Sequence, residues 1–517
     1  MRLGIDFGTT RTVVAVCDRG NYPVVGFVGP GGESLDWYPT VVAERDGALR
    51  YGLEALGLMA DPSWTVVRSF KRFLSSPAVQ PDGIVRIGGT DLTLLDLLTG
   101  FFEALQRDIR EDSNLPEPRR ASIDFEAFVA TPANAHSTQR FLTLEAFRRA
   151  GFEVAAMMNE PSAAGVEYAH RYRNTITKGR ENIVVYDLGG GTFDVSLVRM
   201  TGQNHDVAES SGIARLGGDD FDSVLLDLAL AERGISRRTL TSRTLEVLSV
   251  HCCEQKERLN NNSRKIVIEL GAFLNPRERE TLNVAEDAVV TVKASDFYDA
   301  CEPLIERTLE TLARVTPDGD SLMSDVAGIY VVGGASALPA ITRRLRKTYG
   351  RRVHRSPYPS AATAIGLAIA MDSEAGYQLT ERFSHTFGVF REAHDGAEVA
   401  FDTIFDRGTT LKTSESAELT RTYRAVHNVG HFRYIECGWL SARGIPSGDI
   451  TPFADVYFPF DQRLQSGNNN LSTVPIRRAQ RLGHLIQEKY AVDPAGIVEL
   501  TITDLDSGYA CRHRLSR

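Results

Sequence analysis

The chain has 517 residues and a formal net charge of −9; 42% of its residues are hydrophobic and 24% are charged. This length leaves room for two or three domains with ample cores, and the composition is ordinary for a soluble globular protein. The acidic balance argues against nucleic acid as the main partner. The six cysteines show no CxxC spacing and no metal-ligand cluster, which fits a reducing cytosol without structural disulfides.

The N-terminus predicts a strand–turn–strand unit. Apolar, strand-like runs at 2–7 and 11–17 flank a turn that contains Asp6, Gly8, Thr9 and Thr10. No charged segment and apolar leader precede the first run, and no apolar run in the chain reaches transmembrane length. We therefore expect a cytoplasmic protein that has no membrane partner.

A second unit of the same form lies at Val184–Val198. Asp187 ends an apolar run, Gly189, Gly190 and Gly191 make the turn, and a β-like run leaves it. Bare backbone N–H groups in such a turn can form a concave anion site that a phosphate approaches closely. Asp187 could then hold a cation against the phosphate, directly or through water. By itself the turn fits a simple tight turn equally well.

The two aspartates, Asp6 and Asp187, are 181 positions apart (187 − 6). This separation is too long for a solenoid repeat but suits a duplicated subdomain. Two such halves could clamp one polyphosphate and its metal ion from both sides. The chain contains no GxxxxGK[ST] motif, so it is not a P-loop protein.

The remaining elements alternate between strands and helices, which predicts an α/β fold. Period and turn residues predict strands at 125–130, 265–270 and 326–332, and helices at 137–150, from Glu160 onward, and at 297–313.

The turn sequences DFGTT and DLGGGTFDVSLV resemble those of the Hsp70 family of actin-like ATPases. Four further stretches agree with that family in the same order: FKRF at 70–73, VATPANAHSTQR at 129–140 with NEPSAA at 159–164, LGGDDFD at 216–222, and YVVGGASALP at 330–339. The resemblance implies a two-lobed actin-like ATPase domain of duplicated ribonuclease-H-like subdomains at 1–371. It further implies an interdomain linker at 372–382 and a small β-sandwich domain at 383–517.

The resemblance also implies ATP or ADP with Mg²⁺ between the lobes, and K⁺ is a further candidate ion. Asp6 and Asp187 would hold the metal largely through water, and Glu160 would order its water. Lys71 and Thr192 would position the attacking water, and Asp194 would assist through the metal shell. Without the resemblance, Lys71 fits a solvated surface lysine and Glu160 a helix cap. The implied nucleotide contacts are Gly8, Thr9, Thr10, Gly189, Gly190, Gly191, Gly217, Gly218, Lys256, Gly333, Gly334 and Ser336.

Several positions depart from the family pattern. Ala337 stands where an arginine usually stacks on the adenine, a loss of about 0.5–2 kcal/mol, and Ser360 replaces an acidic residue. Around Lys256, one alignment puts Cys253 in place of the family's acid, and another keeps Glu254; both remain open. In the linker, only Tyr377 and Leu379 could dock on the ATPase domain.

The C-terminal part is rich in strand patterns. Three stretches, 384–389, 404–413 and 493–503, resemble strands of the family's peptide-binding sandwich, which would bind extended apolar peptides through backbone hydrogen bonds and one pocket. An unrelated β-domain used for docking is the alternative. Apolar residues from Ile476 to Ile486 recur at helical spacing and predict an amphipathic helix. The chain ends soon after the last strand, so we expect a domain without a helical lid.

These features predict an Hsp70-type chaperone. Slow ATP hydrolysis would be coupled to binding and release of extended apolar segments of unfolded proteins, with a J-domain co-chaperone and a nucleotide exchange factor as partners. The first alternative is an ATP-binding docking or regulatory co-chaperone module without a productive peptide cycle, which Ala337 and the short linker favour. A sugar kinase or filament protein of the actin-like fold is a third class, but it leaves the C-terminal β-domain unexplained.

Overall fold

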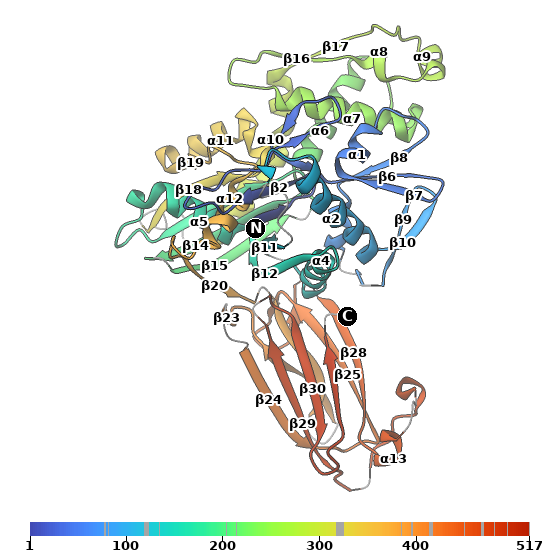
Figure 1. The fold of residues 1–517 in the computed structure, drawn as a ribbon, viewed down its shortest axis with the longest axis vertical. Coiled ribbons are helices and arrows are strands. Elements are labelled where there is room, and N and C mark those ends of the chain that lie inside the picture. Colours follow the sequence, from blue (N-terminus) through green and yellow to red (C-terminus); the bar gives the residue numbers. More distant parts are fainter. Residues whose placement is uncertain are drawn as a thin grey trace.

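The computed structural model describes residues 1–517 except 77–78, 81, 118–123, 134, 203, 214, 317–324, 384, 394–396, 413–416, 449, 467–469, 480, 494 and 516–517. Four residues of the motifs quoted above therefore lie outside the described residues: Asn134, Ser384, Thr413 and Pro494. A large α/β body and a smaller all-β body lie end to end, and the C-terminus returns to the junction between them (Figure 1).

The first lobe is built on a five-stranded sheet of order β12-β11-β1-β2-β5. The predicted hairpin is antiparallel, and β11 pairs with β1 in parallel. The strands are buried almost throughout, as expected of a sheet that is covered on both faces. The elements are β1 (Arg2–Phe7), β2 (Arg11–Val16), β5 (Tyr38–Pro39), α2 (Leu94–Glu111), β11 (Phe125–Thr131), α4 (Ser137–Arg149) and β12 (Phe152–Asn159).

The second lobe repeats this plan in a seven-stranded sheet of order β19-β18-β13-β14-β15-β20-β23. Its central hairpin, β13–β14, is antiparallel, and β18 pairs with β13 in parallel. Helices α5 (Glu160–Tyr172) and α12 (Ala362–Ala370) pack against each other between the two sheets. The strands are β13 (Asn182–Leu188), β14 (Phe193–Thr201), β15 (Asn204–Ile213), β18 (Val326–Val332), β19 (Val353–Arg355), β20 (Gln378–Arg382) and β23 (Thr410–Lys412). The predicted duplication is confirmed.

Each lobe carries an insertion. The insertion of the first lobe has a three-stranded sheet, β7-β6-β8, and a two-stranded sheet, β10-β9; that of the second lobe is mainly helical and includes the pair β16-β17 at the top of Figure 1. The first comprises β6 (Val41–Arg45), β7 (Ala48–Tyr51), α1 (Gly52–Gly57), β8 (Thr65–Arg68), the 3-10 helix Phe70–Ser75, β9 (Ile84–Ile87) and β10 (Thr90–Thr93). The second comprises α6 (Gly218–Ala231), α7 (Ser242–Glu257), β16 (Lys265–Ile268), α8 (Leu270–Phe273), α9 (Pro276–Leu282), β17 (Val290–Lys293) and α10 (Ala294–Val315), and α11 (Pro339–Tyr349) follows β18.

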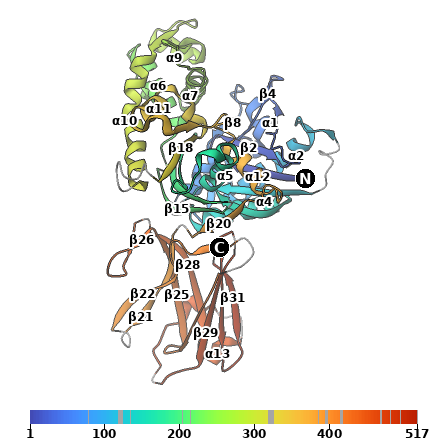
Figure 2. The same cartoon turned by 90° about the vertical axis from the view of Figure 1, so that its left-hand side faces the viewer.

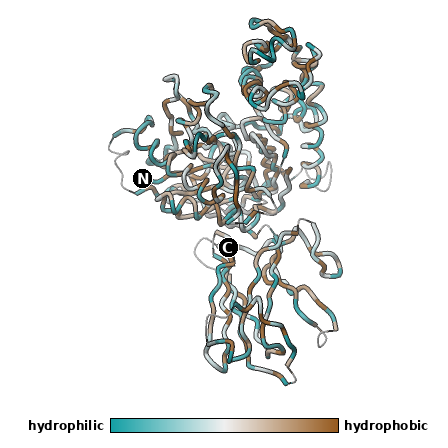
Figure 3. The backbone as a smooth tube through the Cα atoms, turned by 90° about the vertical axis from the view of Figure 1, so that its right-hand side faces the viewer, coloured by the Kyte–Doolittle hydropathy of each residue, from teal (hydrophilic) through white to brown (hydrophobic). Residues whose placement is uncertain are grey.

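The C-terminal body is a sandwich of two four-stranded antiparallel sheets, β22-β21-β25-β28 and β24-β29-β30-β31, which Figure 2 shows side by side. Hydrophobic and hydrophilic residues alternate along its strands (Figure 3), because one face of each sheet forms the shared core. The strands are β21 (Thr386–Ala393), β22 (Glu398–Phe405), β24 (Ala417–Arg424), β25 (Val429–Cys437), β28 (Thr451–Pro459), β29 (Leu485–Val492), β30 (Val498–Asp504) and β31 (Ala510–Arg514). The predicted fold class is confirmed.

The predicted helix between Ile476 and Ile486 is wrong. Residues 474–479 and 481–484 form neither helix nor strand, and β29 begins at Leu485. The backbone N–H of Ala479 donates to Val426 O, so this segment lies along a neighbouring strand end instead of closing helical turns. Ile476 and Leu482 are exposed, which shows that their helical spacing does not mark a buried face.

The segment predicted as a linker takes part in the second-lobe sheet. Strand β20 pairs in parallel with β15 and antiparallel with β23, which comes from the later part of the chain. The β-sandwich also contacts the first lobe, where Arg140 Nε on α4 donates to Ala495 O at 2.9 Å and Ile497 joins the core of that lobe. Among the described helices, none is both long and apolar enough to cross a bilayer.

Candidate active site

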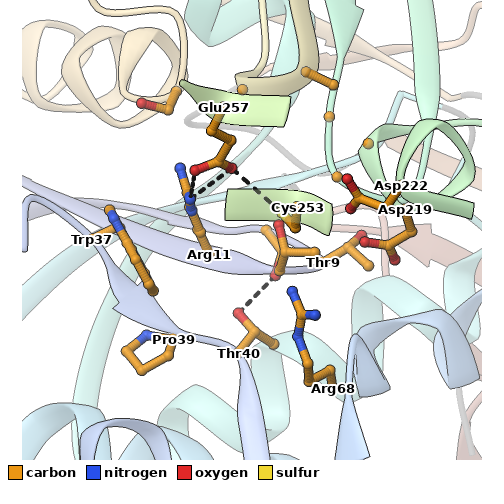
Figure 4. A pocket seen from close by; sticks show the side chains of 18 of the residues that line it. Thr9, Arg11, Trp37, Pro39, Thr40, Arg68, Asp219, Asp222, Cys253 and Glu257 are labelled. Carbon is orange, nitrogen blue, oxygen red and sulfur yellow. Dashed lines mark hydrogen bonds and ion pairs between the residues drawn. The ribbon is translucent and has the colours of Figure 1, made fainter. Parts of the chain in front are cut away.

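A cavity of about 700 Å³ lies between the two lobes, where the turns of the two central hairpins face each other. Most of the predicted site residues line it: Asp6, Gly8, Thr9, Thr10, Lys71, Glu160, Asp187, Gly189, Gly190, Thr192, Gly218, Lys256, Gly333 and Gly334. Gly191, Asp194, Gly217 and Ser336 are outside the lining. Figure 4 shows the cavity from close by, with Thr9 and Thr40 on one side and Asp219 and Asp222 on the other.

Carboxylates of both lobes surround one lysine at the bottom of the cavity. Asp6 is the penultimate residue of β1, Asp187 is the penultimate residue of β13, and Glu160 is the first residue of α5. Lys71 Nζ lies 3.1 Å from Glu160 Oε1, and only 8% of Lys71 is exposed. The predicted surface alternative for Lys71 is therefore wrong, because the 3-10 helix turns this side chain inward.

The cluster holds more negative than positive groups. Burial, together with the Glu160 carboxylate, raises the pKa of Asp6 and of Asp194 to about 7. The same causes raise the pKa of Asp187 well above its usual range. One ammonium group does not compensate for several buried carboxylates, so the site is electrostatically incomplete without a further cation.

The glycines let the two turns touch. A Cβ on Gly190 would stand 2.3 Å from Thr10 Oγ1, and one on Gly217 would stand 2.6 Å from Gly191 N. Gly218 N–H donates to Gly189 O, which ties the LGGDDFD segment to the second turn. A Cβ on Gly191 would stand 2.6 Å from Thr9 Cγ2 of the first lobe, whereas one on Gly217 would displace the second turn within its own lobe. Ser336 O–H donates to Gly333 O at 2.6 Å and closes the turn after β18.

Lys256 is held away from solvent on α7. Its Nζ lies 2.7 Å from Asp222 Oδ1 and donates to Gly218 O at 2.8 Å. Although burial alone would lower it, the pairing with Asp222 raises the pKa of Lys256. Cys253 and Glu254, the two residues left open by the alignments, both line the cavity on the same helix. Ala337 and Ser360 also line it, so the departures from the family pattern fall within the cavity.

A clasp across the mouth of the cavity was not predicted. Arg11, directly after the first turn, donates to both oxygens of Glu257 on α7 at 2.6 and 2.8 Å, and its guanidinium stacks over Trp37 at 4.5 Å (Figure 4). Below it, Arg72 pairs with Asp219 at 3.1 Å. The partners Arg11 and Glu257 are 246 positions apart, and no sequence pattern links them.

Comparison with known proteins identifies the family. A family model described as "Hsp70 protein" matches residues 121–386, which is more than half of the chain. The chain belongs to the Hsp70 family. It is 29% identical over 477 residues to the "Chaperone protein HscA homolog" of Burkholderia cenocepacia, an alignment that covers 86% of this chain and 72% of that protein.

Proteins of the same name from other species are similarly related to this Hsp70 member. The identity is 29% over 474 residues in Burkholderia lata and 28% over 474 residues in Burkholderia multivorans, with the same shares of each chain covered. The predicted family is therefore confirmed, and members of this family are ATPases.

Proposed function

We propose that this Hsp70 member is a slow ATPase whose nucleotide state controls binding and release of extended apolar segments of unfolded proteins. The observation that carries the proposal is the position of Lys71 among Asp6, Glu160 and Asp187, where two glycine-containing turns meet. A J-domain co-chaperone and a nucleotide exchange factor are the partners we propose, in keeping with relatives named as HscA chaperones.

ATP or ADP with Mg²⁺ fits the cavity chemically. Carboxylate oxygens are the ligands that Mg²⁺ prefers, and the raised pKa values of Asp6 and Asp194 mark a site that lacks positive charge. The crowded glycines leave backbone rather than side chains facing the space between the turns. When bound, Mg²⁺ neutralises charge on the transferring phosphoryl group. K⁺ is a second ion that the remaining carboxylate charge could hold.

Each residue has a defined task in this proposal. Asp6 and Asp187 anchor the metal, largely through water, and Glu160 orders that water while holding Lys71 by their ion pair. Lys71 places its ammonium group beside the transferring phosphoryl group, where negative charge develops. Thr192, which hydrogen-bonds Asp194, positions the attacking water. Because these groups only position and neutralise, we expect slow turnover.

The phosphates would lie over the two turns. Gly189 N–H is engaged with Thr192 O inside the second turn, so we propose that Gly190, which lines the cavity, supplies its main phosphate contact and that the adjoining Gly191 assists. Gly8, Thr9 and Thr10 would serve from the first turn. Gly217, Gly218, Lys256, Gly333, Gly334 and Ser336 would form the nucleoside side. With Ala337 in place of an arginine, we expect weaker adenine stacking.

Coupling to the β-domain would run through β20. This strand belongs to the sheet of the second lobe, and it also pairs with β23, which belongs to the later part of the chain. A change in the angle between the lobes would therefore act directly on the sandwich. We propose domains at 1–371 and 383–517 with the linker at 372–382.

One observation favours the alternative of a docking module. Arg391 on β21 pairs with Glu488 on β29 at 2.6 Å, inside the sandwich, and Glu488 is fully buried. A charged pair that joins the two sheets takes space that an apolar pocket would need. In this second candidate function the chain binds ATP and docks on a partner without releasing peptides.

The deciding experiment measures the dissociation rate of a labelled extended apolar peptide in ATP and in ADP, with hydrolysis followed in the same sample. Faster release in ATP, and hydrolysis stimulated by peptide, support the coupled chaperone. Turnover without any peptide effect would favour the docking module. Lys71→Ala should reduce turnover by roughly 10²–10³-fold, and Lys265→Ala, which changes an exposed lysine on β16, is the matched control.

A further inference from the structure

Three side chains of metal-ligand type meet at the junction of the two bodies, away from the nucleotide cavity. His136 is the N-cap of α4 in the first lobe, His385 precedes β21, and Glu436 is the penultimate residue of β25. One ligand atom from each lies within 4.8 Å of the other two. None of the three lines the cavity between the lobes.

The three groups lie close together at the junction, and the two imidazole rings stack. His136 Nδ1 lies 3.9 Å from Glu436 Oε2. The imidazole rings of His136 and His385 face each other, with their centroids 4.5 Å apart and their planes inclined by 30°. His385 is 5% exposed and Glu436 is 1% exposed, so the cluster is shielded from bulk water.

The Glu436 carboxylate accepts hydrogen bonds from a further residue, as carboxylates that bind metals usually do. Ser137 N–H donates to Glu436 Oε2 at 3.1 Å, and Ser137 O–H donates to Glu436 Oε1. A cap on the N-terminus of α4 would explain these two bonds. It would not explain why histidines from both bodies converge on the same carboxylate.

We propose that His136, His385 and Glu436 form a site for a divalent transition metal ion, Zn²⁺ in the first place, which joins the β-sandwich to the first lobe. Two imidazole nitrogens and one carboxylate oxygen are an established Zn²⁺ ligand set, which leaves a fourth position for water. Zn²⁺ bonds of about 2.0–2.1 Å place tetrahedral ligands roughly 3.3 Å apart. His136 Nδ1 and Glu436 Oε2, now 3.9 Å apart, therefore need to close by about 0.6 Å. The other pairs, which lie within 4.8 Å, need to close by at most about 1.5 Å.

The nearby positive charges have their own partners. The positive charge of Arg140 interacts electrostatically with Glu436, and its guanidinium donates hydrogen bonds to Thr131, Asn159 and Ala495. The positive charge of Arg407 interacts electrostatically with His385, and its guanidinium forms an ion pair with Glu209 at 2.9 Å. Both guanidinium groups therefore have hydrogen-bond or ion-pair partners outside the cluster.

The site has a consequence for domain arrangement. Its ligands come from both bodies, so the metal can be fully bound only while the sandwich contacts the first lobe. By mass action, Zn²⁺ then raises the population of this docked arrangement. This inference goes beyond the proposed ATPase cycle, since it requires neither nucleotide nor peptide.

The test titrates the full chain, after chelator treatment and without nucleotide, with Co²⁺. We expect one equivalent of Co²⁺ to give intense visible d–d absorption, which Zn²⁺ then abolishes. His385→Asn and His136→Asn, one from each body, should each weaken Co²⁺ binding at least 100-fold while circular dichroism stays unchanged. Absence of these bands in the unaltered chain, or Co²⁺ affinity in either variant equal to that of the unaltered chain, would overturn the proposal.

A matched control comes from a second group, His484, Asp504 and Asp506. There Asp504 accepts hydrogen bonds from His484 at 2.7 Å and from the backbone N–H of Asp506 at 3.0 Å, as in a closed turn. His484→Asn should leave the Co²⁺ signal intact. If it abolishes the signal instead, the metal belongs to that turn and the interdomain site is refuted.

The clamping role has its own readout. Amide hydrogen exchange at β20 should slow at least fivefold when Zn²⁺ is added to the unaltered chain, and it should not respond in His385→Asn. Metal binding without any change at β20 would refute the clamp. Neither result depends on ATP turnover, so a failure of this inference is distinct from a failure of the proposed function.

Discussion

Two buried clusters of charged residues in this protein differ in their balance of charge. In the cavity between the lobes, Asp6, Glu160 and Asp187 face a single lysine, and burial raises the pKa of the aspartates. In the β-sandwich, Arg391 pairs with Asp402 at 2.7 Å and with Glu488 at 2.6 Å.

In the sandwich cluster, two arginine side chains balance the charge of the two carboxylates. Arg421 also pairs with Asp402 at 3.0 Å, and despite burial these arginine bonds lower the pKa of Asp402. Tyr423 and Tyr490 donate to Glu488 as well. A buried cluster whose charges are not balanced indicates a ligand site, whereas a cluster with balanced charges indicates a structural role. The following predictions test that distinction, from the largest expected effect to the smallest.

Glu488→Ala should destabilise the sandwich by about 3 kcal/mol, because Arg391 would lose its buried partner and keep only Asp402. Urea unfolding followed by Trp439 fluorescence, with Trp37 and Trp64 replaced by phenylalanine, measures this. Glu418→Ala removes a half-exposed pair with Lys489 on neighbouring strands and should cost less than about 1 kcal/mol. If Glu488→Ala and Glu418→Ala lowered the free energy of unfolding equally, the buried network would not stabilise the sandwich.

Lys71→Ala should reduce ATP turnover by roughly 10²–10³-fold, the cost of removing one positioned charge from a developing anion. The unfolding midpoint of the β-sandwich should not change, because the two clusters lie in different bodies. Single-turnover hydrolysis separates the chemical step from nucleotide binding. Turnover close to that of the Lys265→Ala control would contradict the role assigned to Lys71.

Gly190→Ala should lower nucleotide affinity about tenfold, equivalent to roughly 1.4 kcal/mol. The added Cβ would meet Thr10 Oγ1 at 2.3 Å and separate the turns. Calorimetric titration with ADP and Mg²⁺ measures the change. Gly89→Ala is the control, because its Cβ would meet only Glu44 at 3.7 Å, in ordinary contact. Unchanged ADP affinity would show that the phosphates do not lie between the turns.

Arg11→Ala should accelerate ADP release by no more than about fivefold. The Arg11–Glu257 pair is partly exposed, with 29% and 45% of the side chains accessible, and such pairs contribute about 0.2–1 kcal/mol. Release of a fluorescent ADP analogue, measured at low and high salt, tests this. Arg50→Ala, which breaks the exposed pair with Glu54 inside the first lobe, should have no effect. An acceleration well above fivefold in Arg11→Ala would show that the pair contributes more than an exposed ion pair to holding ADP.

Local sequence was sufficient wherever the chain itself sets the structure. The two Asp–Gly–Thr turns, strand 326–332 and the helices around Ser137 and Glu160 lie where period and turn residues predicted them. The predicted helix at 476–486 failed because hydrogen bonds to a distant strand end, such as Ala479 N–H to Val426 O, outweighed its apolar spacing. Helical spacing is a weak predictor of a helix where tertiary contacts offer the backbone other hydrogen-bond partners.

The sequence by itself determined the family and the α/β class, and it placed most of the predicted site residues at the cavity between the lobes, since short motifs encode those turns. Only the tertiary structure decided that Lys71 is buried against Glu160, that Arg11 meets Glu257, and that His136, His385 and Glu436 converge. These contacts join residues that are far apart along the chain. Packing of whole sheets and helices brings them together, and no local pattern records the result.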